Sequence, residues 1–260
     1  MAETVRSKLL SRHATIGSWL EIPHASAAEI MARAGFDWLV IDAEHGGIDI
    51  ETGTDLMRAI RAANPDCEAF VRVTDNHPLA IRRALDAGAT GVVVPLINSG
   101  AEAEKAVTAA KYPPRGVRGY GFSPANAYGA EFADYTARAN EDISVVVQVE
   151  HVDALAHIDE ILAVDGVDAA FLGPWDMSGS MGIPGRLDDP RMTQATQSIL
   201  EACAAHGRAA GTLITRPDPE AVRRTIEQGF TFLAISGDVL MLDHVARALV
   251  NNARKALRQA

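Results

Sequence analysis

Eight short apolar runs, each suited to a β-strand, alternate along this chain with segments whose apolar residues have helical spacing. Runs such as 145–149 contain β-branched residues without regular polar alternation, which is typical of strands in a parallel sheet covered by helices. Eight strands alternating with helices over 260 residues are expected for a (β/α)8 TIM barrel, with residues 1–260 as a single domain. The predicted strands are 16–20, 38–42, 69–73, 91–95, 145–150, a run ending near Gly173, 209–214 and 232–235.

Helical spacing predicts helices over 25–34, 51–63, 78–88, 101–111, 154–162, 193–206 and 220–228. A last helix, from about 239 to the end, is longer than a barrel needs, and we expect it to extend past the barrel or to be exchanged between subunits. Residues 112–142, rich in glycine and aromatic residues, are expected to be irregular. A doubly wound open sheet is the alternative fold, but it usually has fewer strands and a Gly-rich first turn.

The net charge and the cysteines indicate which partners and which cellular compartment to expect. The formal net charge of −10 argues against nucleic acid and anionic membranes as partners, because both would be repelled. Cys67 and Cys203 have neither metal-type spacing nor a disulfide framework, which suggests a reducing compartment. No run has the length of a signal core or a membrane span, so a cytoplasmic location is expected.

Two of the predicted strands are followed by a carboxylate, Glu150 after one and Asp176 after the other. Residues at the carboxyl ends of barrel strands form the rim where such enzymes place their chemistry. Two carboxylates at this rim can share a hard divalent cation, with water completing its coordination. Gly173 and Pro174 precede Asp176, and glycine permits a close approach by a ligand. The alternative is that both acids cap the helices that follow them.

Other polar side chains are expected at the same rim. His45 lies on a Gly-rich loop, where a histidine is suited to proton transfer near neutral pH. Arg72 ends a strand and offers a planar fork for a carboxylate or an enolate oxygen. The alternatives are an ordinary loop histidine and an ion pair of Arg72 with Glu44 or Asp42. The predicted substrate-binding residues are Arg72, Gln148, Gly173, Pro174, Trp175, Asp176 and Leu213.

Nearly the whole chain resembles the HpcH/HpaI family of metal-dependent (class II) pyruvate aldolases. Several separate motifs in one order carry this resemblance, which makes it more specific than any single motif. They are Asp37-Trp-Leu-Val-Ile-Asp-Ala-Glu-His45, Val71-Arg-Val73, Leu85-Asp-Ala-Gly-Ala89, Tyr112-Pro-Pro-Arg-Gly-Val-Arg-Gly119, Gln148-Val-Glu150, Gly173-Pro-Trp-Asp-Met-Ser178 and Ala210-Gly211.

The resemblance implies roles for individual residues. Glu150 and Asp176 are expected to bind a divalent cation such as Mg, Mn or Co, with Zn also possible. Arg72 is expected to stabilise an enolate, and His45 to move the proton of the acceptor. The role of Asp86, as the partner of His45, rests on the resemblance alone. Family members are hexamers of two trimers, so a homo-oligomer is expected too.

The implied reaction is reversible cleavage of 4-hydroxy-2-oxo acids to pyruvate or hydroxypyruvate plus an aldehyde. Many members have a small residue in place of Trp175, which is therefore expected to narrow the acceptor pocket. A lysine Schiff base is excluded, because every lysine lies in a helical or terminal context: Lys8, Lys105, Lys111 and Lys255. The alternatives are another carbon–carbon lyase, such as an oxaloacetate decarboxylase or an acyl-CoA ester lyase, and a barrel that only binds partners.

Overall fold

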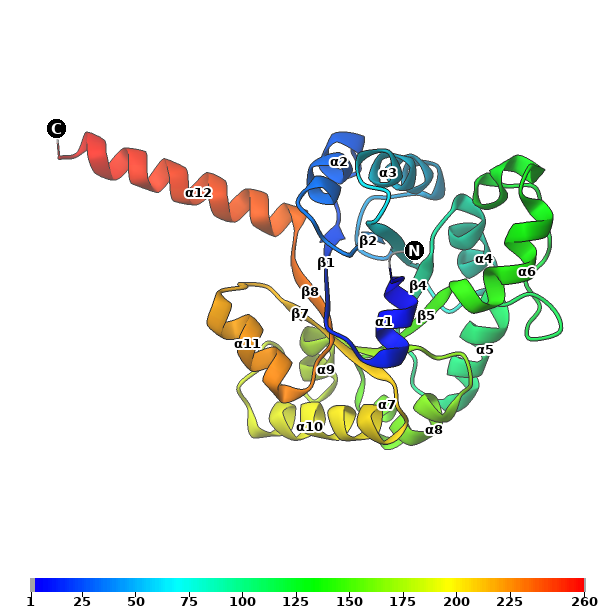
Figure 1. The fold of residues 1–260 in the computed structure, drawn as a ribbon. Coiled ribbons are helices and arrows are strands. Elements are labelled where there is room, and N and C mark those ends of the chain that lie inside the picture. Colours follow the sequence, from blue (N-terminus) through cyan, green and yellow to red (C-terminus); the bar gives the residue numbers. More distant parts are fainter. Residues whose placement is uncertain (1–2, 260) are drawn as a thin grey trace.

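The computed structural model describes residues 3–259, which form a closed barrel of parallel strands in the order β1 to β8 (Figure 1). Each strand pairs with the next, and β8 pairs with β1 to close the ring. The (β/α)8 prediction is therefore confirmed. The strands are β1 (Thr15–Leu20), β2 (Trp38–Asp42), β3 (Glu68–Arg72), β4 (Gly91–Val94), β5 (Ser144–Val149), β6 (Ala169–Leu172), β7 (Ala209–Ile214) and β8 (Phe232–Gly237).

Helices surround this ring and connect successive strands (Figure 1). Those that follow β1 to β4 are α2 (Ala25–Arg33), α3 (Ile50–Ala63), α4 (Pro78–Ala87) and α5 (Gly100–Ala110). Those that follow β5 to β7 are α7 (Val152–Ala156), α8 (Ile158–Ala163), α9 (Pro174–Ser180), α10 (Pro190–Ala205) and α11 (Pro219–Gln228). The single helix predicted over 154–162 is two short helices, because the backbone of His157 leaves the helical region between them.

Aromatic side chains fill the inside of the barrel near the starts of the strands. Trp38 stacks on Phe232 with ring centroids 4.0 Å apart, and Phe70 lies beside both rings. Glycine makes room for this layer, since a Cβ on Gly17 would lie 2.0 Å from the Trp38 ring and one on Gly91 would lie 2.2 Å from the Phe70 ring. The aromatic layer closes the barrel interior and leaves open the end where the strands finish.

A helix that was not predicted, α1 (Val5–Ser11), lies across the middle of the ring of strands in Figure 1. Its Val5 and Leu9 side chains are buried in the inner aromatic cluster. Arg6 pairs with the buried Asp168 at 3.1 Å, which links α1 to the start of β6. Because α1 has only seven residues and buries only two apolar side chains, its sequence is too short to show helical periodicity.

The prediction of an irregular segment over 112–142 is wrong for its second half. A 3-10 helix, η1 (Pro124–Gly129), is followed by the regular helix α6 (Phe132–Asp142). Only Ala139 of α6 is buried, so the helix lacks the wide apolar face from which helices are recognised. Its position is fixed instead by contacts such as the edge-to-face pair of Tyr135 with Tyr112.

The last helix, α12 (Asp238–Leu257), projects away from the barrel (Figure 1). Asp238 is its only buried residue, whereas Leu242 and Leu249 are more than 60% exposed. The predicted extension past the barrel is confirmed. No helix within residues 3–259 combines the length and apolar character needed to cross a membrane.

Candidate functional site

A cavity of about 110 Å³ opens at the carboxyl ends of the barrel strands. Every residue predicted to bind substrate lines this cavity. These residues lie on or directly after β3, β5, β6 and β7. The lining residues are Trp19, Glu21, Arg72, Gln148, Phe171, Gly173, Pro174, Trp175, Asp176, Leu213, Ser236, Gly237 and Leu240.

Glu150 follows β5 directly and is almost completely buried beside this cavity. Its Oε1 accepts a hydrogen bond from the backbone N–H of Leu96 at 2.9 Å, and its Oε2 accepts one from the Gln148 amide. A Cβ on Gly173 would lie 2.6 Å from Oε2, so only glycine leaves the carboxylate this position. Glu150 is not the cap of α7, because the His151 side chain accepts the N–H of Asp153 at that helix end.

Asp176 lies in the first turn of α9, which begins after Gly173 with Pro174 as its first residue. No side-chain hydrogen bond caps this helix, and Asp176 is exposed to the cavity. The adjoining Trp175 is 59% exposed and packs on Gly185, where a Cβ would lie 2.8 Å from its ring. Trp175 thus forms part of the cavity wall, and its narrowing of an acceptor pocket stays a prediction.

The acidic groups around Glu150 fit a divalent cation. Burial raises the pKa of Glu150, and the charges of Asp176 and Glu44 raise it further. Two buried oxygens, Glu44 Oε2 and Gln148 Oε1, have no hydrogen-bond partner within residues 3–259. No group of three or more His, Cys, Asp or Glu in that range forms a metal cluster. Glu150 and Asp176 lie close enough for their charges to interact, and their carboxylates are hard oxygen donors of the kind that Mg and Mn prefer.

Arg72, the last residue of β3, is held by two acids and an aromatic ring. Its Nε and Nη2 donate to the two oxygens of Asp42 at 2.9 and 2.6 Å, and Nη1 lies 3.2 Å from Glu44. The guanidinium carbon is 4.4 Å from the centroid of the Trp19 ring. The ion pairs considered as an alternative role are thus present, but Arg72 also lines the cavity and has N–H groups that Asp42 does not occupy.

His45 lies on the loop after β2, outside the set of residues that line the cavity. Its backbone N–H donates to Asp42 Oδ1 at 3.2 Å, and its side chain is 67% exposed with Nε2 3.9 Å from Glu44 Oε2. Glu44, which the sequence analysis treated only as a possible ion-pair partner, therefore connects His45 with Arg72. Burial is the largest cause of its raised pKa.

Asp86 is not brought to this site within one chain. It is eight residues beyond Pro78 on α4, about 12 Å along the helix axis from the end that follows β3. Its Oδ1 accepts a hydrogen bond from the buried Arg118 at 2.8 Å. The pairing of Asp86 with His45 stays a prediction, and it requires a second copy of the chain.

Glu21 and Ser236 line the cavity but were not among the predicted residues. Glu21 follows β1 directly, so it has the same strand-end position that identified Glu150. Burial raises the pKa of Glu21, as do Asp42 and Asp238, whereas Arg72 and His45 favour its ionised form. Ser236 has a positive φ of 56°, a conformation uncommon for residues other than glycine.

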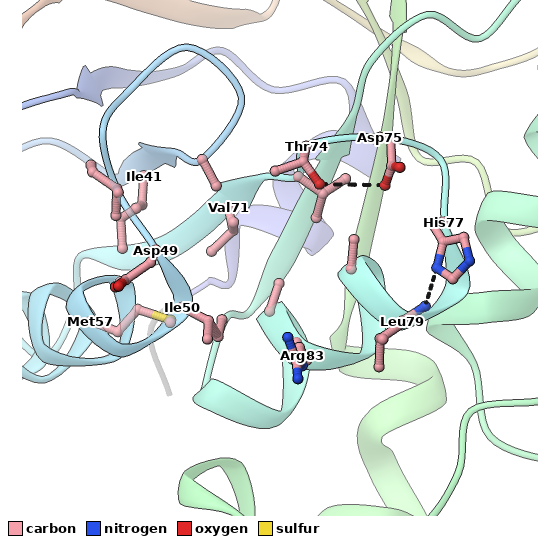
Figure 2. A pocket seen from close by; sticks show the side chains of 16 residues that line it. Ile41, Asp49, Ile50, Met57, Val71, Thr74, Asp75, His77, Leu79 and Arg83 are labelled. Atoms are coloured by element: carbon pink, nitrogen blue, oxygen red, sulfur yellow. Dashed lines mark hydrogen bonds between the residues drawn. The ribbon is translucent and has the colours of Figure 1, made fainter.

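A larger groove, of about 400 Å³, lies outside the barrel between α3 and α4 (Figure 2). Its walls are mostly apolar, with Ile41, Met57 and Val71 among them. Several of its polar side chains are engaged in local structure, since Asp49 caps α3, His77 caps α4 and Thr74 donates to Asp75. Arg83 is the one charged lining residue outside these contacts in the described chain, and the rim cavity, where several charged groups converge, is the better candidate for chemistry.

Known proteins match the chain over most of its length. It is 41% identical over 236 residues to the hydroxypyruvate/pyruvate aldolase of Agrobacterium fabrum. The aligned region covers 90% of this chain and 87% of that protein. It is 38% identical to the 2-dehydro-3,6-dideoxy-6-sulfogluconate aldolase of Pseudomonas putida, with 93% of each protein covered. The chain is therefore similar to aldolases that differ in substrate.

The fold and the family agree with these relatives. An HpcH/HpaI aldolase/citrate lyase family protein from Burkholderia cenocepacia superposes with a TM-score of 0.92 at 34% identity, covering 97% of this chain and all of that one. The model of the same family matches residues 15–244, which contain the whole barrel and the cavity residues. The chain belongs to the HpcH/HpaI aldolase/citrate lyase family of enzymes.

Proposed function

We propose that this protein is a class II pyruvate aldolase, which cleaves 4-hydroxy-2-oxo acids to pyruvate or hydroxypyruvate plus an aldehyde. The observation that carries the proposal is one small cavity on the barrel rim that Arg72 and Asp176 line, with Glu150 buried beside it near Asp176. Relatives at 34% to 41% identity are named as aldolases of hydroxypyruvate, pyruvate, a sulfogluconate derivative and a deoxy-keto-glucarate. These names support an aldehyde-lyase acting on small 2-oxo acids.

Glu150 and Asp176 would hold the divalent cation, which supplies Lewis acidity to the keto oxygen of a 2-oxo acid. Gln148 and the N–H of Leu96 fix the Glu150 carboxylate in its orientation, because each donates to a different oxygen. Arg72 lines the cavity, so its guanidinium is assigned to stabilise the negative charge that develops on the enolate oxygen.

His45 is assigned to the proton of the acceptor hydroxyl. In cleavage, a base removes that proton as the carbon–carbon bond breaks, and in synthesis the proton returns to the new alkoxide. The ring of His45 is exposed, and its Nε2 lies 3.9 Å from Glu44 Oε2. Asp86 is assigned to orient this ring from a neighbouring subunit.

The cavity has no lysine among its lining residues in the described part of the chain. The one deeply buried lysine, Lys111, donates to the backbone oxygens of Asn140 and Ile143 at the end of α5. Burial lowers its pKa to about 8, but its hydrogen bonds hold it next to the start of β5. This supports enolate chemistry at Glu150 and Asp176 over a Schiff base.

Removal of divalent cations is expected to abolish exchange of the pyruvate methyl protons with deuterated solvent. The reason is that, without the cation, Arg72 is left to stabilise the enolate while the negative charges of Glu150 and Asp176 oppose its formation. Proton NMR of pyruvate with chelator-treated protein measures the exchange, and added Mg or Mn should restore it. Full exchange after exhaustive removal of metal would contradict the proposed function. Rates with Mg, Mn, Co and Zn then identify the preferred ion.

We also propose a homo-oligomer, a hexamer in which α12 is exchanged between subunits. The helix exposes Leu242, Val245 and Leu249, while a groove lined by Ile16 and Ile226 beside β1 and α11 is uncovered. A projecting apolar helix and a vacant apolar groove on the same chain are complementary.

Light scattering is expected to give a mass of several subunits, six in the proposed assembly. Leu249→Asp should shift the mass towards the monomer, because a buried charge would destabilise the packed helix. Arg247→Ala is the control on the same helix, since Arg247 is exposed and contacts only Asp243 in the described chain. A fully active wild-type monomer would refute the assembly.

A further inference from the structure

The carboxylate of Glu21 is directed into the rim cavity without a partner. Glu21 lines the cavity, and its side chain has no hydrogen bond or ion pair with any residue from 3 to 259. Its backbone is fixed, because the N–H groups of Glu21 and Ile22 donate at 3.0 Å to the two oxygens of the buried Asp238. The chain end of β1 is thus held in place, and the unpaired carboxylate of Glu21 is part of the cavity wall.

Glu21 lies on the wall opposite the carboxylates that would hold the cation. In the closed order β1 to β8, the end of β1 faces the end of β5, which Glu150 follows. Glu21 Oε1 is 3.7 Å from the position of a Cβ on Gly237, at the end of β8. If a 2-oxo acid is held near Glu150 and Asp176, the wall formed by the ends of β1 and β8, which includes Glu21, is the side of the cavity left for the acceptor aldehyde.

We propose that Glu21 selects the acceptor aldehyde of the proposed aldolase, accepting neutral or cationic aldehydes and rejecting those that carry a carboxylate beside the carbonyl group. The inference rests on the proposed function and specifies its acceptor class. Glu21 does not take part in bond making, since it lies across the cavity from the carboxylates that hold the donor. Its hydrogen-bond-accepting oxygens suit the hydroxyl groups of a hydroxyaldehyde.

Arg72 does not cancel the charge of Glu21. Its guanidinium is already paired with Asp42 and lies 3.2 Å from Glu44, so these three groups together carry a net negative charge when ionised. Leu213 and Leu240, which also line the cavity, offer no positive charge. An anionic acceptor therefore meets like charge on this wall, and the partly enclosed cavity screens it less than open water does.

The test compares two acceptors of similar size, neutral glycolaldehyde and anionic glyoxylate, in aldol addition with pyruvate and Mg at mildly alkaline pH. Glu21→Gln should raise the ratio of kcat/KM for glyoxylate to that for glycolaldehyde by about 10-fold, since one repulsive charge is removed. Glu21→Lys should raise the ratio further. The control is Glu29→Gln on the exposed face of α2, which removes the same charge away from the cavity and should leave the ratio unchanged.

Methyl-proton exchange of pyruvate separates this inference from the proposed function, because exchange needs no acceptor. Glu29→Gln should exchange at the wild-type rate, and exchange measured in Glu21→Gln and Glu21→Lys identifies the variants in which the donor site is still assembled. An unchanged acceptor ratio in variants that retain exchange would overturn the role of Glu21 alone. Absence of exchange in the metal-loaded wild type would overturn the proposed function and this inference with it.

Discussion

Replacing Arg72 by alanine is expected to slow both aldol cleavage and methyl-proton exchange by about 10²–10³, the typical loss when one donor to a developing oxyanion is removed. Both reactions pass through the enolate, so both require the positive charge of the Arg72 guanidinium at the cavity. Steady-state kinetics for cleavage and proton NMR for exchange measure the two losses, which should agree within a few-fold.

The same change also affects stability, because Arg72 compensates a buried charge. The Asp42 side chain is fully buried, and Arg72 donates two hydrogen bonds to it. Removing one partner of a buried ion pair typically costs about 3–5 kcal/mol. Arg72→Lys keeps the positive charge beside Asp42 but loses the planar fork, so it should retain more of the stability than Arg72→Ala while remaining strongly impaired in exchange.

Thermal unfolding of both variants separates a folding defect from a catalytic one. Arg33→Ala is the control, because Arg33 is exposed in the last turn of α2 and lies outside the cavity. If Arg72→Lys folds with the wild-type midpoint and exchanges methyl protons at the wild-type rate, Arg72 serves only to neutralise Asp42.

The residues of the rim could be predicted because a strand end is visible in the sequence. The apolar run that forms β5 ends at Val149, and this strand end identified its neighbours Gln148 and Glu150 as rim residues. Gly173 and Asp176 were found in the same way at the end of β6. Closure of the barrel then brings these ends together, so a one-dimensional pattern was sufficient for this part of the site.

Among the site residues that the sequence did not predict are Glu21, which no motif contains, and Glu44, whose contacts depend on a loop conformation. Glu21 has the same strand-end signal as Glu150, but it lies outside the motifs that drew attention to the other residues. The connection of Glu44 with both Arg72 and His45 depends on the conformation of the loop after β2, which Asp42 fixes through backbone N–H groups. No spacing rule describes such a loop, because its hydrogen bonds are local and specific.

Replacing His45 by alanine is expected to slow cleavage of a 4-hydroxy-2-oxo acid by about 10²–10⁴, the usual contribution of a positioned acid or base. The loss should be much smaller for decarboxylation of oxaloacetate, which forms the same enolate without deprotonating an alcohol. That reaction needs Arg72 and the cation that Glu150 and Asp176 would hold, but no base for an alcohol. The difference between the rate losses in the two reactions therefore measures how much His45 contributes to moving the proton of the acceptor oxygen.

The exposure of His45 makes this contrast informative. Its side chain is 67% exposed and only 3.9 Å from Glu44, so its removal should leave the barrel core and the Arg72–Asp42 pair intact. His13→Ala is the control, since His13 is exposed just before β1 begins, at the end of the barrel opposite the cavity. Measured with one metal at one pH, equal losses in cleavage and decarboxylation for His45→Ala would mean that the histidine positions the substrate and carries no proton.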